Sequence, residues 1–211
     1  MSDTEETEYL SLNSSFSNLK KEDKIQPILK KEIFPIKTVE IISDLLNNIC
    51  EGNKSKLSQT NNKIKPFMTI TIPVMTIKDY LLRLSQYTKI NESTLIIILI
   101  YIDRICKINN FQLNFKNIYK LILSSMIIAI KYNEDTFYST QVYAKLGGVS
   151  PQELNFLEMQ FLILIKFSLF VEKALYDKYY DNLISFNEDI KSEDEEDNES
   201  DSGQSNDDKD N

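Results

Sequence analysis

The spacing of apolar side chains predicts that this chain folds into helices. From residue 38 onward, apolar side chains recur every three or four positions, which is the spacing of one helix face. The first such face consists of Val39, Ile42, Leu45, Leu46 and Ile49. The stretch 51–65 is polar and rich in Asn and Lys, and Gly52 favours the end of the preceding helix. We therefore predict an amphipathic helix and a polar connector over residues 38–65.

A run of helices is predicted after Pro73. Two sequences, Thr-Ile-Lys-Asp at 76–79 and Ser-Pro-Gln-Glu at 150–153, have the pattern of an N-terminal capping box. The second box also has Pro at the first helical position, where it is favoured. The Gly-Gly pair at 147–148 is a typical stop for the helix before it. The first of these helices is predicted to begin at Thr76. The later ones are predicted at 91–107, 118–131, 139–146, 151–166 and 171–184.

Two of the predicted helices are apolar on nearly all sides. Residues 95–102 are eight consecutive apolar side chains, and 118–131 is rich in Leu, Ile, Met and Ala. A helix without a polar face is expected at the centre of a domain. Isoleucine also suits strands, but the predicted helices 91–107 and 118–131 both exceed ten residues without an internal Gly or Pro, whereas strands usually run about four to eight. The predicted fold class is therefore all-α, with one domain of about five helices and flanking helices.

Charge is unevenly distributed along the chain. The net charge is −8, yet residues 187–211 hold 12 acidic and 2 basic side chains, and residues 1–10 hold four acidic ones. Residues 11–186 therefore carry a net charge of +6. The acidic C-terminal stretch has too few apolar side chains to offset the entropy of ordering. We predict a flexible segment at 1–37, the helix and connector at 38–65, the folded domain with its following helix at 66–186, and a disordered acidic tail at 187–211.

Composition excludes several kinds of chemistry. The chain has no His, which removes His-based triads, general bases and metal ligands. Cys50 and Cys106 are too few for a zinc cluster or a disulfide framework, and they suit a reducing compartment. The chain begins with acidic residues rather than a basic-then-apolar leader, and its longest apolar run is far below the roughly 20 residues of a membrane span. We expect an intracellular protein, in cytoplasm or nucleus, without cofactor or metal.

Five short motifs occur in order between residues 66 and 182. They are Phe67 with Ile77-Lys-Asp-Tyr-Leu-Leu-Arg83, Tyr101-Ile-Asp-Arg104, Ala129-Ile-Lys-Tyr-Asn-Glu-Asp135, Tyr143-Ala-Lys-Leu-Gly-Gly148, and Leu154-Asn-Phe-Leu-Glu158 with Phe161-Leu162. Together they resemble the cyclin box of the P/U-type cyclins, the phosphate-signalling cyclin group of fungi, plants and protists. Each motif alone is weak, but all five in order are specific. The resemblance implies a single-box cyclin, because no second helical repeat follows residue 184.

Three positions depart from the pattern of that group. The usual His-Arg at the start of the third box helix is Tyr-Lys at 119–120, and the usual Asp-Asp is Glu-Asp at 134–135. The sequence Asp-Tyr-Leu at 79–81 resembles the Asp-Trp-Leu of the substrate-docking patch of mitotic cyclins. The Arg that precedes it in those cyclins is missing, since Val-Met occupies 74–75. The resemblance therefore does not imply docking of substrates at that patch.

The resemblance implies a kinase-binding surface centred on Lys131 and Glu158. In cyclins this Lys and this Glu lie near each other on the surface that meets the kinase, beside the mobile C-helix of the kinase. Without the resemblance, the simplest interpretation is an intramolecular surface salt bridge, worth about 0–1 kcal/mol. Tyr132 and Phe137 are candidate exposed anchors, because aromatic side chains dominate interface energetics. Tyr143 is expected in the core.

The predicted function is that of a regulatory cyclin subunit, which binds and activates a cyclin-dependent protein kinase and is not an enzyme itself. We expect no nucleic-acid, membrane or small-molecule partner. One alternative is a cyclin-fold scaffold or adaptor that does not activate a kinase. Another is a nucleic-acid-binding cyclin fold of the transcription factor B type. Residues 66–182 contain 12 basic and 9 or 10 acidic side chains, and this balance is too even for a surface that binds phosphates. An enzyme is disfavoured, because no nucleophile–base pair, metal cluster or phosphate cradle can be named.

Overall fold

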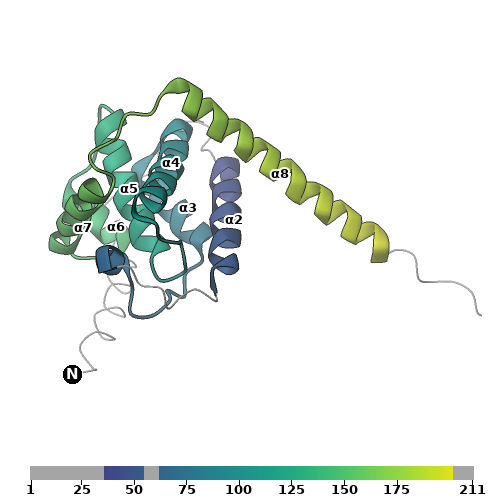
Figure 1. The fold of residues 1–211 in the computed structure, drawn as a ribbon, viewed down its shortest axis with the longest axis horizontal. Coiled ribbons are helices and arrows are strands. Elements are labelled where there is room, and N and C mark those ends of the chain that lie inside the picture. Colours follow the sequence, from purple (N-terminus) through teal and green to yellow (C-terminus); the bar gives the residue numbers. More distant parts are fainter. Residues whose placement is uncertain (1–35, 55–61, 202–211) are drawn as a thin grey trace, which may run out of the picture. The chain divides into compact units, whose positions relative to one another are not determined.

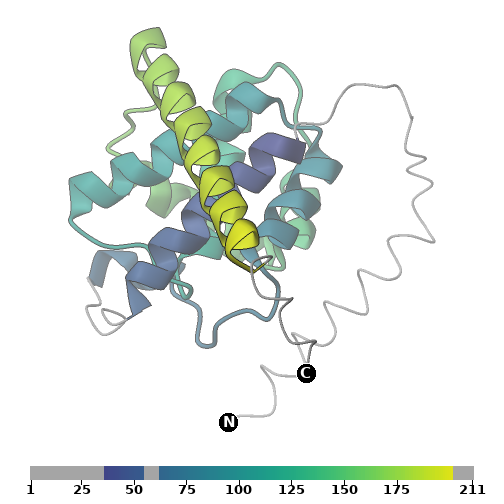
Figure 2. The same ribbon diagram turned by 90° about the vertical axis from the view of Figure 1, so that its right-hand side faces the viewer.

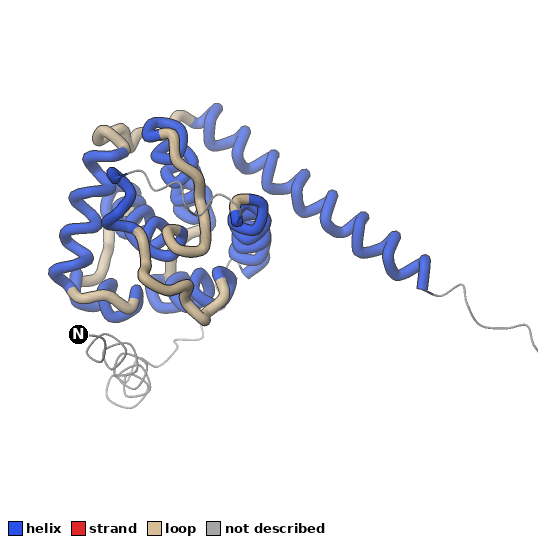
Figure 3. The backbone as a smooth tube through the Cα atoms, turned by 60° about the horizontal axis from the view of Figure 1, so that its bottom comes forward, coloured by secondary structure: helices blue, strands red, loops and turns tan. Residues whose placement is uncertain are grey.

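The computed structural model describes residues 36–54 and 62–201, with side chains up to residue 188. Helices are the only regular elements among the described residues, and no strand occurs there, as the sequence predicts (Figure 3). The described chain forms two units, divided after Phe170. The first unit contains α2 (Ile36–Gly52), the 3-10 helix η2 (Asn62–Phe67), α3 (Ile77–Thr88), α4 (Glu92–Asn109), α5 (Ile118–Asn133), α6 (Thr140–Gly147) and α7 (Pro151–Leu164) (Figure 1). The second unit contains α8 (Lys173–Asp201).

Helices α4 and α5 form the centre of the first unit. Every residue of 94–102 in α4 and of 121–130 in α5 is buried. Helix α5 packs against α4 and α7, and α2 packs against α3 and α4. Figure 2 views the unit from the side on which α2 lies across the other helices. The prediction that the two helices without a polar face are central is therefore confirmed.

The helix starts follow the capping signals of the sequence. The Thr76 hydroxyl accepts a hydrogen bond from the backbone N–H of Asp79 at 3.0 Å, and the Ser150 hydroxyl accepts one from the N–H of Glu153 at 3.1 Å. Helix α7 begins at Pro151, the predicted first position. These side chains satisfy backbone donors that the first turn of a helix leaves without partners. The N-cap hydrogen bond of each predicted capping box is confirmed.

The two glycines at the end of α6 serve different purposes. A Cβ atom on Gly147 would collide with the side chain of Leu123 on α5, so this position permits α6 to approach α5 closely. Gly148 has a φ of 73°, in the left-handed region that favours glycine. The pair therefore ends α6 and turns the chain into α7, which brings α5, α6 and α7 together on one side of the unit.

Two predicted boundaries are wrong. Helix α2 begins at Ile36, so the last two residues of the predicted flexible segment 1–37 are helical. Helix α8 continues through Asp201, although disorder was predicted from residue 187. No Gly or Pro occurs between residues 173 and 201, and Glu has a good helix propensity, so the chain contains no local stop there. Residues 1–35, 55–61 and 202–211 lie outside the described residues, and the predictions for them remain predictions.

Candidate functional site

An ion pair joins the last turn of α5 to the middle of α7. The Lys131 Nζ atom lies 2.7 Å from Oε1 and 2.8 Å from Oε2 of Glu158. The side chain of Lys131 is 32% exposed and that of Glu158 only 17%. The structure thus places these two predicted site residues together, on two helices that pack against each other. Two hydrogen bonds and partial burial make this pair better ordered than an ordinary surface pair.

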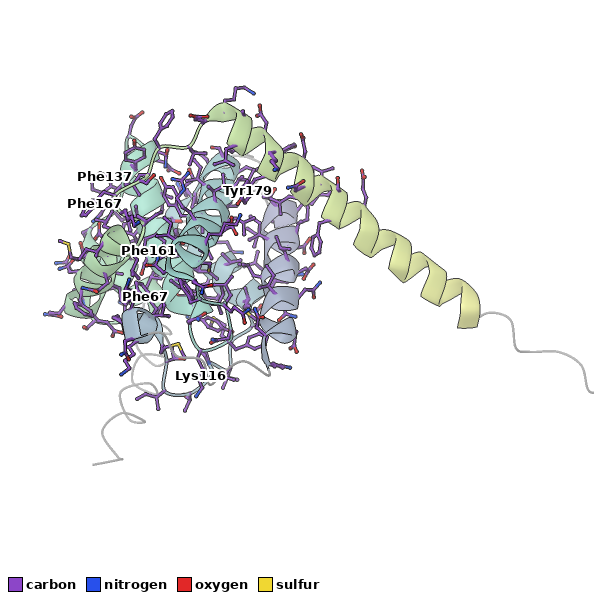
Figure 4. The ribbon with its side chains drawn as sticks, in the orientation of Figure 1. Phe67, Lys116, Phe137, Phe161, Phe167 and Tyr179 are labelled. Atoms are coloured by element: carbon purple, nitrogen blue, oxygen red, sulfur yellow. The ribbon has the colours of Figure 1, made fainter. Side chains whose placement is uncertain are left out.

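Aromatic side chains surround the C-terminal end of α5. Tyr132 is 52% exposed and Phe137 is 58% exposed, so both predicted anchors point largely into solvent. Figure 4 labels Phe137. Tyr138 is also exposed, and its backbone N–H donates to the Tyr143 hydroxyl at 3.1 Å. Tyr143 itself is 1% exposed, which confirms its predicted place in the core. Burial raises the pKa of the Tyr143 phenol, and the bond from Tyr138 partly opposes that rise.

Glu134 fixes the end of α5 against the start of α4. Its carboxylate accepts a hydrogen bond from the Thr94 hydroxyl at 2.8 Å and a longer one, at 3.5 Å, from the backbone N–H of Asn91. Asn91 stands at the N-cap of α4, but its own side chain makes no capping hydrogen bond. The carboxylate of another helix therefore supplies the negative partner that the N-terminus of α4 favours. This arrangement holds in place the turn that carries Lys131 and Tyr132.

Helix α7 has a second apolar face that the sequence analysis missed. Its inner face is buried and consists of Leu154, Leu157, Phe161 and Leu164. Three large apolar side chains on the outside, Phe156, Met159 and Ile163, are each 51–53% exposed. We call these three residues the outer stripe of α7. The available signal was that helix 151–166 is apolar on opposite faces, although a single surface helix needs only one.

The chain leaves α7 in an uncommon conformation. Lys166 and Phe167 both have positive φ angles, 56° and 53°, which non-glycine residues seldom adopt. Phe167 and Phe170 are 64% and 69% exposed. The Tyr101 hydroxyl of α4 donates to the Leu169 carbonyl at 2.8 Å. We call residues 166–170 the post-α7 turn; it too was not anticipated from the sequence.

The chemistry of these residues suits protein docking. Within 36–54 and 62–201 no three His, Cys, Asp or Glu residues come together as metal ligands would. Burial raises the pKa of the Cys50 and Cys106 thiols to about 12, so neither is an activated nucleophile. None of the described helices has the length and hydropathy needed to cross a membrane. Exposed large apolar side chains beside a partly buried ion pair are features of protein interfaces.

Comparison with known proteins agrees with this architecture. A family model described as Cyclin matches residues 12–169. Cyclin-U2-1 of Arabidopsis thaliana is 34% identical over 149 residues, which are 67% of this chain and 67% of that protein. Cyclin-P3-1 of Oryza sativa subsp. japonica is 29% identical over 182 residues, 84% of this chain and 72% of the relative. PHO85 cyclin-7 of Saccharomyces cerevisiae is 32% identical over 169 residues, 69% of this chain and 59% of the relative.

The chain belongs to the cyclin family, and its relatives place it among the P/U-type cyclins. The all-helical first unit is its cyclin box. Cyclins are regulatory proteins that bind and activate cyclin-dependent protein kinases, and this is the function of the class to which the chain belongs. The family resemblance inferred from the five motifs is confirmed.

Proposed function

We propose that this cyclin binds its kinase through Lys131 and Glu158, with Tyr132 and Phe137 as anchors beside the pair. The observation that supports the proposal is the ion pair itself, which sits with its carboxylate largely covered at an edge lined by exposed aromatic side chains. The outer stripe lies on the same helix as Glu158, with Met159 about 100° further around the helix axis. Together these residues form the candidate kinase-binding surface.

Lys131 and Glu158 have hydrogen-bonding capacity left for a partner. An ammonium has three donors and a carboxylate about four acceptor positions, while the pair uses two hydrogen bonds. A backbone carbonyl and N–H of the kinase would complete the set once the surface is desolvated. Because a partnered charge is less costly to bury than a lone one, the preformed pair lowers the cost of burying this edge. Exposed aromatic side chains supply the apolar contact area around it.

Activation follows if this surface prefers one shape of the kinase. A ligand shifts a conformational equilibrium only by its difference in affinity for the two states. We propose that the surface contacts the mobile C-helix of the kinase in its active position and binds the inactive position more weakly. The cyclin then contributes no reacting group of its own. Its free Cys50 and Cys106 fit a reducing compartment, so we place the protein inside the cell. The proposal includes no nucleic-acid, membrane or small-molecule partner.

The test uses the cyclin-dependent kinase recovered with the tagged protein from its own cells. We expect Lys131→Ala and Glu158→Ala each to weaken kinase binding by about 2 kcal/mol, which is roughly thirtyfold in Kd. Lys107→Ala is the matched control, since Lys107 also forms an ion pair, with Asp103 of its own helix, but is 73% exposed. Calorimetric titration measures the affinities, and a kinase assay on the complex measures activation.

A charge exchange separates the two interpretations of the pair. Lys131→Glu combined with Glu158→Lys keeps an intramolecular ion pair but reverses the groups that face the kinase. Full recovery of binding in this double variant would show that the pair acts only as an internal salt bridge. We expect binding to stay impaired while the free energy of unfolding returns toward that of the natural chain. A kinase that binds but is not activated would favour a scaffold role instead.

A further inference from the structure

The post-α7 turn stores backbone strain. Left-handed φ angles at non-glycine residues cost on the order of 1–3 kcal/mol each, and Lys166 and Phe167 adopt them in succession. Helices commonly end with Gly or Asn in the left-handed conformation, which avoids this energetic cost, but neither residue occurs at 166 or 167. Local hydrogen bonds shape the turn: the N–H of Lys166 donates to Ile163 O at 3.0 Å, and the N–H of Phe167 donates to Leu162 O at 2.9 Å. Strain that persists must be held by the surroundings.

Two side chains of α4 hold the post-α7 turn by hydrogen bonds to its carbonyls. Arg104 donates through Nη1 to the Ser168 carbonyl, and through Nη1 and Nη2 to the Phe170 carbonyl at 3.2 and 3.3 Å. Tyr101, one helical turn earlier and fully buried, donates to the Leu169 carbonyl at 2.8 Å. Three consecutive carbonyls of the turn therefore accept hydrogen bonds from one face of α4. A planar guanidinium suits such forked contact, which Lys cannot reproduce.

Burial raises the pKa of the Tyr101 phenol, and the Asn133 side chain opposes that rise. Asn133 is the last residue of α5, next to Tyr132 and two positions after Lys131. The post-α7 turn follows α7, the helix that carries Glu158, and it exposes Phe167 and Phe170 to solvent. Burying these rings instead would have been the favourable choice for an isolated domain.

We propose that Tyr101 and Arg104 are positioning residues for kinase binding. They hold the post-α7 turn in its strained form, so that Phe167 and Phe170, just after the helix that carries Glu158, are preordered apolar contacts for the kinase. Neither positioning residue touches the kinase itself. This inference rests on the proposed function, because the kinase is the partner for which the turn is ordered. It also gives a role to the Tyr-Ile-Asp-Arg motif at 101–104, which the binding surface itself leaves without one.

The experiment compares two variants that remove donors but preserve bulk, Tyr101→Phe and Arg104→Met. Binding to the recovered cyclin-dependent kinase is measured by calorimetry, and stability is measured by urea unfolding. We expect each variant to weaken binding about tenfold. Arg104→Lys should not restore full affinity. Hydrogen exchange at the amides of 166–170 should become faster in both variants, while amides in the middle of α5 keep their protection.

A double-mutant cycle distinguishes positioning from general destabilisation. In a chain that already carries Phe167→Ala and Phe170→Ala, we expect Tyr101→Phe and Arg104→Met to weaken binding no further. Continued weakening in that background would overturn the inference. So would unchanged affinity of both variants in the otherwise natural chain, while Lys131→Ala still weakens binding; that result leaves the proposed function standing. Unchanged affinity of Lys131→Ala and Glu158→Ala would instead contradict the proposed function.

Discussion

Helices α5 and α7 both carry apolar side chains on more than one face, yet their surroundings differ. Helix α5 is enclosed, and ten consecutive residues, 121–130, are buried. Helix α7 is buried along one face and exposes the outer stripe of Phe156, Met159 and Ile163 on the other. The same sequence signal therefore has two structural outcomes. An apolar face that the chain itself does not cover marks where another protein is expected to bind.

The largest effect on stability is expected inside α5. Leu123 is fully buried and lies against Gly147 of α6, so Leu123→Ala leaves a cavity that the neighbouring helices cannot fill. We expect a loss of about 3 kcal/mol in the free energy of unfolding, measured by urea denaturation. The matched control is Ile163→Ala in the outer stripe, which should stay within about 0.5 kcal/mol. Equal losses in the two variants would remove the contrast between the helices.

The next effect concerns binding by the outer stripe. Met159→Gln and Ile163→Gln keep the size of the side chain but make it polar. We expect each to weaken kinase binding by about 1–2 kcal/mol in a calorimetric titration, because apolar contacts near the centre of an interface dominate its affinity. The free energy of unfolding should change little, since both residues are half-exposed. Unaltered affinity together with unaltered stability would mean that the stripe lies outside the interface.

A smaller effect is expected where α5 meets α4. Glu134→Gln removes the charge at the N-terminus of α4 but keeps an acceptor for the Thr94 hydroxyl. We expect a loss of about 0.5–1 kcal/mol of stability, which added salt should reduce. Thr94→Val removes the hydroxyl donor instead and should cost a similar amount. If Glu134→Gln had no effect at low ionic strength, the capping role of this carboxylate would be refuted.

The last effect is absent at neutral pH and appears only at alkaline pH. Desolvation raises the pKa of two thiols, the buried Cys50 on α2 and the partly buried Cys106 on α4, from 9.0 to about 12. The unfolded chain therefore loses these protons first, and stability should be constant below pH 9 and fall between pH 9 and 12. A Cys50→Ala variant should show a shallower fall in urea unfolding. An unchanged slope would mean that the thiol at position 50 is not responsible.

Sequence patterns predicted the core well because burial follows local spacing. The capping signals at Thr76 and Ser150 and the two central helices depend only on neighbours along the chain. The pairing of Lys131 with Glu158 came from family resemblance, since residues on two helices share no local pattern. The outer stripe of α7 escaped prediction because composition does not reveal which apolar face is covered. The post-α7 turn escaped it because Lys166 and Phe167 carry no glycine signal for left-handed backbone.

The bridge from Glu134 to the start of α4 has a consequence for the rate of complex formation. It fixes the end of α5, so the cyclin side of the encounter needs no slow rearrangement before docking. Association should then proceed at about 10⁵–10⁷ M⁻¹s⁻¹, in a single kinetic phase with respect to the cyclin. Any slower phase would belong to the kinase, whose moving helix alone would lose conformational entropy. The cyclin thus acts as a preshaped template, and differences in lifetime between complexes arise mainly from dissociation.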